Sequence, residues 1–70
     1  MKSQNQLANI LKNARLKAKM TQVEVAEKAG IHPNYYARVE RGEVNPTADI
    51  VDLLAKALQV KVRFPLEESK

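Results

Sequence analysis

Apolar residues recur at helical spacing over most of the chain. At its start they are Leu7, Ile10, Leu11, Ala14 and Ala18, which are the i, i+3, i+4, i+7 and i+11 positions of a helix. This spacing predicts an amphipathic helix over residues 5–18 with these side chains on its inner face. Leu16 lies off this face, so we expect it to be partly exposed.

End signals predict where a second helix begins and ends. Thr21 and Glu24 have the T-x-x-E spacing of a capping box, in which each side chain pairs with a backbone amide at the other residue. The helix therefore begins near Gln22. Gly30 ends it, because glycine readily adopts the positive φ that a helix C-terminus favours.

Two further helices follow. Pro33 suits the first position of a third helix over residues 33–41, since the N–H that proline lacks has no helical partner there. Gly42 is placed to end it. Thr47 is placed as the N-cap of a fourth helix over residues 48–58, which is the most apolar segment and the expected centre of the core.

The C-terminal residues alternate instead. Val60, Val62 and Phe64 are separated by single basic residues, which is the period of a strand, and Pro65 then stops any ladder. They are either a strand paired across a dimer or an extended tail on the monomer core. We favour the dimer contact, built with the end of the fourth helix from Leu58, Val60, Val62 and Phe64.

The second and third helices, joined by a tight turn through Gly30, form a helix-turn-helix pattern. Such a pair needs apolar residues where the helices face each other, and the chain has Val25, Ala29, Ile31, Tyr36 and Val39 there. Ala26 supplies the small residue needed at the close approach. Tyr36 is the unusual choice, since a branched aliphatic side chain fits such a site more easily.

Four stretches together resemble the lambda-repressor/Cro-like (XRE) regulators. They are TQVEVAEKAGI at 21–31, VERG at 39–42, NPT at 45–47 and LLAKAL at 53–58. The resemblance covers about residues 7–60. It implies an all-α fold of four to five helices with an extended tail. The chain is then one domain, 1–70, with its core at about 5–60 and its tail at 61–70.

The resemblance also implies a homodimer that recognises a pseudo-palindromic site in double-stranded DNA, with the third helix in the major groove. Such a protein is a transcriptional regulator, with repression the favoured mode. Position by position, the base-reading residues are His32, Pro33, Asn34, Ala37 and Arg38. Tyr35 beside them contacts a base or a phosphate.

Phosphate contacts are expected around this helix, at Thr21, Gln22, Arg41, Asn45, Lys17 and Lys19. Arg15 and Glu40 match a pair that forms an internal salt bridge in the family, tying the first helix to the third. The chain departs from the family pattern at four positions, one of which is Pro33, where the family has a polar side chain. His32 replaces the usual Ser or Thr cap, Lys19 replaces a glycine that commonly ends the first helix, and Glu43 replaces a basic residue.

Charge and composition agree with a polyanionic partner. The 70 residues carry a net charge of +4. Residues 1–41 hold eight basic and three acidic side chains, a net +5, whereas residues 42–70 hold four basic and five acidic ones, a net −1. A basic half of this kind is typical of nucleic-acid binding, although many solvated surfaces share it.

Other function classes are disfavoured. The absence of cysteine excludes disulfides and thiolate chemistry, and the single His32 is too few for a zinc site, so we expect no metal and no cofactor. No catalytic constellation is recognisable, and an enzyme is not expected. With no membrane-length apolar run and no signal-peptide pattern, we expect a cytoplasmic protein that does not bind membranes.

Two alternatives stay open at this point. The first alternative is a DNA-binding antitoxin or protein-binding adaptor. Such a protein would bind a toxin or other protein partner through its tail or its fourth helix. A controller of a restriction–modification operon is a variant of the regulator hypothesis.

Overall fold

The fold is all-helical over residues 3–60, the part of the chain that the computed structural model describes. Its elements are α1 (Ser3–Lys17), α2 (Gln22–Ala29), α3 (Pro33–Glu40) and α4 (Ala48–Leu58). The four predicted helices are confirmed, although α1 is displaced by one or two residues from the expected 5–18. The expected strand or tail at Val62 and Phe64 lies outside the described residues.

Side chains cap the helices at their beginnings. In the capping box of α2, the Glu24 amide donates to Thr21 Oγ1 at 3.0 Å and the Thr21 amide donates to Glu24 Oε1 at 2.8 Å. Thr47 Oγ1 accepts from the Ile50 amide at the start of α4. These caps satisfy backbone donors that have no partner within the helix.

All four helices end in the same hydrogen-bond pattern. After α2, Gly30 donates to the Glu27 carbonyl and Ile31 donates to the Ala26 carbonyl, which is a Schellman motif. In each motif one residue has a positive φ. It is Lys19 (60°) after α1, Gly30 (76°) after α2, Gly42 (74°) after α3 and Gln59 (58°) after α4. Lys19 thus takes the left-handed conformation without the glycine usual there.

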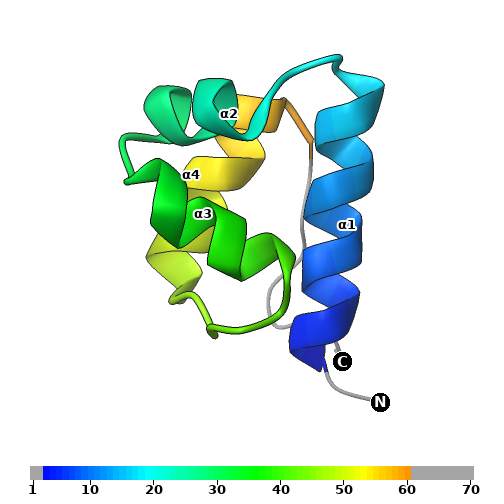
Figure 1. The fold of residues 1–70 in the computed structure, drawn as a ribbon, viewed down its shortest axis with the longest axis vertical. Coiled ribbons are helices and arrows are strands. Elements are labelled where there is room, and N and C mark those ends of the chain that lie inside the picture. Colours follow the sequence, from blue (N-terminus) through cyan, green and yellow to red (C-terminus); the bar gives the residue numbers. More distant parts are fainter. Residues whose placement is uncertain (1–2, 61–70) are drawn as a thin grey trace.

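The core lies where α1 and α4 meet the helix pair α2 and α3. Its largest fully buried side chains are Tyr36, Leu11, Leu54, Val25 and Val39. α1 runs along one side of the molecule, and α3 crosses in front of α4 on the other (Figure 1). Ala26 at the close approach is fully buried, as its small size predicts.

The prediction for the inner face of α1 is wrong at two residues, Ile10 and Ala18. Ile10 is 41% exposed, and Ala18 is exposed because α1 ends at Lys17 and the chain turns away. The inner face instead follows Leu7, Ala8 and Leu11, with Arg15 continuing it toward α3. Leu16 is exposed, as predicted.

Candidate nucleic-acid interface

The outer face of α3 carries the predicted base-reading residues. His32, Asn34 and Arg38 are exposed, whereas Pro33, Tyr35 and Ala37 are partly buried. The opposite face of α3 is held in the core by Tyr36, Val39 and Glu40. Since α1 and α2 pack against the helix and hold it in place, its outer face is a rigid surface rather than a loop.

His32 begins α3 in the role that Ser or Thr usually has. Its Nδ1 accepts a hydrogen bond from the Asn34 amide at 3.0 Å, and its backbone is extended. A neutral imidazole that accepts through Nδ1 carries its proton on Nε2. His32 can therefore cap the helix and still offer one N–H donor at the edge of the α3 surface.

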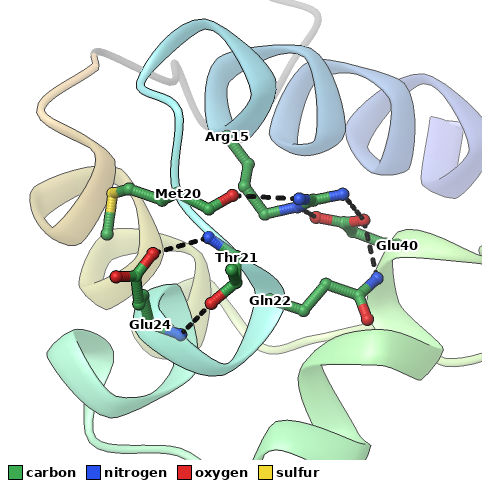
Figure 2. A network of polar contacts seen from close by, with 6 residues as sticks. All are labelled: Arg15, Met20, Thr21, Gln22, Glu24 and Glu40. Carbon is green, nitrogen blue, oxygen red and sulfur yellow. Dashed lines mark hydrogen bonds and ion pairs between the residues drawn. The ribbon is translucent and has the colours of Figure 1, made fainter.

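Beneath this surface lies an ion pair between α1 and α3. Arg15 Nε is 2.7 Å from Glu40 Oε2, Arg15 Nη2 donates to Glu40 Oε1 at 3.2 Å, and Arg15 Nη1 donates to the Met20 carbonyl at 3.0 Å (Figure 2). The Glu40 side chain is only 3% exposed. The salt bridge implied by the family resemblance is therefore present.

Gln22 extends this pair to the start of α2. Its Nε2 donates to Glu40 Oε1 at 3.0 Å, while its amide oxygen points away from the pair (Figure 2). One carboxylate thus connects α1, α2 and α3. Gln22 was expected to contact phosphate. One hydrogen of its side-chain NH2 group is already bonded to Glu40, so a phosphate contact would use the second hydrogen or the backbone N–H.

Burial and hydrogen bonding oppose each other at Glu40. Burial alone would raise the pKa of this carboxyl group, but the hydrogen bonds, chiefly from Arg15, outweigh it and the pKa is lowered. The hydrogen bond with Glu40 raises the pKa of Arg15 correspondingly. Both groups are therefore charged at neutral pH.

Tyr36 lies next to this charged pair. Its ring is fully buried, and burial, followed by the nearby Glu40 carboxylate, raises the pKa of its phenol. The hydroxyl has no hydrogen-bond partner, although it lies close enough to Glu40 and Arg15 to influence the pKa of both groups. The tyrosine is thus a core residue, as predicted, with an unpaired polar atom at its tip.

A second charged group lies at the exposed end of α3. Glu43 binds Arg41 through two hydrogen bonds, Nε–Oε2 at 2.7 Å and Nη2–Oε1 at 3.3 Å. Its Oε1 is also 3.5 Å from Arg38 Nε. The predicted base reader Arg38 and the predicted phosphate contact Arg41 therefore share one carboxylate.

The other predicted phosphate contacts are exposed but scattered. Thr21 uses its hydroxyl in the capping box, and Asn45 lies in the loop before α4. Lys17 is exposed at the end of α1. Lys19 borders a hollow between the end of α1, α2 and the end of α4, which no α3 residue lines.

The predicted dimer residues are divided. Leu58 is 5% exposed and belongs to the core of its own chain, and Val60 packs against that core. Leu58 therefore offers little surface to a partner. Val62 and Phe64 lie outside the described residues, so the dimer contact stays a prediction.

Sequence reasoning did not predict two side-chain interactions of the candidate interface. The bond from Gln22 to Glu40 spans 18 residues, and no local pattern indicates it. The pairing of Glu43 with two arginines had a visible signal, an acidic residue where the family commonly has a basic one.

Residues 3–60 contain no cluster of three metal-ligating side chains and no helix long and apolar enough to cross a membrane.

Comparison with known proteins decides the family. A helix-turn-helix family model matches residues 11–64. The chain belongs to the lambda-repressor/Cro-like (XRE) helix-turn-helix family. This XRE chain is 38% identical over 52 residues to the immunity repressor protein of Bacillus phage phi105. The 52 aligned residues are 74% of this chain and 36% of the phage protein.

Other relatives agree. An uncharacterized HTH-type transcriptional regulator of Mycobacterium tuberculosis (strain CDC 1551 / Oshkosh) is 35% identical over 52 residues, which are 74% of this chain and 37% of that protein. The XRE chain thus spans little more than a third of the length of these curated relatives.

Among solved structures, the XRE chain is similar to the restriction-modification controller protein C.Esp1396I. The tetramer of that protein in complex with its natural 35 base-pair operator has a TM-score of 0.80 and 29% identity, covering 83% of this chain and 76% of the other. A variant of the same controller also has a TM-score of 0.80, at 28% identity, with 83% and 75% covered.

Proposed function

We propose that this chain binds double-stranded DNA sequence-specifically and acts as a transcriptional regulator, in the simplest case a repressor. The observation that carries the proposal is the two-sided α3. One face is buried through Tyr36 and Val39, and the other exposes His32, Asn34 and Arg38. A rigid helix with a polar outer face suits the major groove.

The exposed side chains have the chemistry that base reading requires. Asparagine pairs with the N6 and N7 edge of adenine, and arginine pairs with O6 and N7 of guanine. Asn34 and Arg38 are four residues apart and so share one face of α3. At the start of α2, the Gln22 and Val23 amides take no part in the capping box and suit contacts to phosphate.

The likeness to a controller solved with its operator supports the same docking. We propose a homodimer on a pseudo-palindromic site, with half-sites about 34–36 Å apart, one turn of duplex. Control of a restriction–modification operon is a specific form of this function, favoured by the same structural likeness.

The test is selection from a random duplex library by the untagged protein at near-physiological salt, followed by substitution of Arg38. The expected result is enrichment of a pseudo-palindrome. Arg38→Ala should then weaken binding to that site by about 1–3 kcal/mol and relax the preference at one base pair. Lys56→Ala, which removes the same charge from the exposed face of α4, is the control and should leave the preference unchanged.

Two results would count against the proposal. Absence of any enriched sequence would remove sequence-specific binding, and equal losses on all sequences for Arg38→Ala would make Arg38 a phosphate contact. The toxin–antitoxin alternative stays a prediction from the sequence. Its test is co-purification with a small protein encoded beside it.

A further inference from the structure

The backbone at the end of α3 fixes where Glu43 lies. Gly42 has a φ of 74°, which turns the chain back toward the helix. The Glu43 amide then donates to the Arg38 carbonyl at 2.9 Å. Glu43 is therefore attached to α3 through its backbone, and its carboxylate lies beside the last turn of the helix.

One carboxylate oxygen, Oε1 of Glu43, faces two arginines. It accepts from Arg41 Nη2 at 3.3 Å and is 3.5 Å from Arg38 Nε. The contact to Arg38 is through Nε, so it does not use the Nη groups that would reach a base edge. The three side chains are each about half exposed, at 55% for Arg38, 56% for Arg41 and 46% for Glu43.

Exposed ion pairs of this kind contribute little to folding stability. Their effect on a polyanion is larger, because an arginine bound to a carboxylate must exchange it for a phosphate, and the carboxylate itself repels phosphate. An arginine that contacts the carboxylate through Nε can keep this contact while its Nη groups bind a base. It then has no carboxylate to exchange, and no phosphate is repelled. The arrangement thus weakens backbone contacts while leaving base contacts intact.

We infer that Glu43 is a specificity-determining residue that competes with DNA phosphate for Arg41 and orients Arg38 toward a base edge. This inference rests on the proposed function, since it assigns roles at the same DNA-binding surface. Glu43 acts through the two arginines and is a positioning residue, with no direct base contact required.

The test compares Glu43→Gln with wild type on the selected operator and on a random duplex, over a range of salt concentrations. On random duplex, Glu43→Gln should bind about fivefold more tightly at 0.15 M salt and steepen the salt dependence by about one phosphate contact. On the operator the gain should be smaller, because Arg38 loses its support. The ratio of operator to random affinity therefore falls.

The matched control is Asp52→Asn, which removes another exposed carboxylate that pairs with a single cation, Lys56, on α4. It should leave the ratio unchanged. In an Arg38→Ala background, Glu43→Gln should raise both affinities equally, since no arginine is left to orient. An unchanged ratio in Glu43→Gln itself, whether both affinities rise together or neither changes, would overturn the inference.

These outcomes are distinct from failure of the proposed function. If wild type shows no preferred sequence, the proposed function fails before Glu43 is tested. If wild type has an operator and Glu43→Gln retains the full ratio, only the role of Glu43 is lost.

Discussion

Arg15 and Glu40 are 25 positions apart in the chain, yet Nε of one and Oε2 of the other are 2.7 Å apart beneath the candidate DNA-binding surface. Their side chains are 13% and 3% exposed. The pair joins α1 to the end of α3, and Gln22 ties the start of α2 to the same carboxylate. The relative positions of the two helices of the motif are thus fixed by one buried carboxylate as well as by the apolar core between them.

Breaking this pair on one side should destabilise the fold strongly. Glu40→Gln leaves the Arg15 charge without its partner in a largely buried site, and we expect a loss of about 3–5 kcal/mol in the free energy of unfolding. Replacing both residues by methionine should restore part of that loss, because no unpaired charge remains. Urea denaturation followed by circular dichroism measures both. A loss below 1 kcal/mol in Glu40→Gln would contradict a structural role.

Stability should decrease in acid because of the same carboxyl group. The pKa of Glu40 is lowered from 4.5 in the folded protein, so the unfolded chain takes up a proton at higher pH than the folded one. The contribution of Glu40 is therefore fully present above about pH 4.5 and is lost as the pH falls through the folded pKa. Urea midpoints measured between pH 7 and pH 3 should fall more steeply in wild type than in Glu40→Gln. Parallel slopes would show that other groups cause the acid sensitivity.

The hydroxyl of Tyr36 should be dispensable. It is buried without a hydrogen-bond partner but lies near the Glu40 carboxylate, so these two effects oppose each other and Tyr36→Phe should change stability by less than about 1 kcal/mol. Tyr36→Leu, which also removes ring volume, should cost about 1–3 kcal/mol. Thermal denaturation of the two variants separates the hydroxyl from the ring. A loss above 1 kcal/mol in Tyr36→Phe would mean that the hydroxyl does form a stabilising bond.

The helix ends offer a reciprocal pair of substitutions. No atom of a residue beyond its two chain neighbours lies within 4 Å of the place where a Cβ would stand on Gly30, so Gly30→Ala is opposed by the positive φ alone and should cost about 1–2 kcal/mol. Gln59→Gly relieves the same strain after α4 and should stabilise by about 0.5–1 kcal/mol. Lys56→Gly, inside the last turn of α4, is the control and should destabilise by about 1 kcal/mol. Destabilisation by Gln59→Gly would show that its side chain matters more than its backbone.

The helices could be predicted from the sequence because their causes are local. The capping box of Thr21 and Glu24 and the left-handed Gly30 involve residues within a few positions of each other, and both are present as expected. Ile10 was assigned to the wrong side of α1 because its spacing fits the inner face equally well. Only the placement of α3 and α4 against α1 decides which apolar residues are covered.

The candidate site divides in the same way. The exposed positions of His32, Asn34 and Arg38 follow from the period of a helix whose other face is apolar. That Gln22 donates to Glu40 could not be read from the sequence, because it requires α2 and α3 to cross at one angle. Periodicity and end chemistry act over a few residues and are visible in the chain. Pairing between charges, and the competition of Glu43 for two arginines, depends on distances of a few ångströms that only the packed helices set.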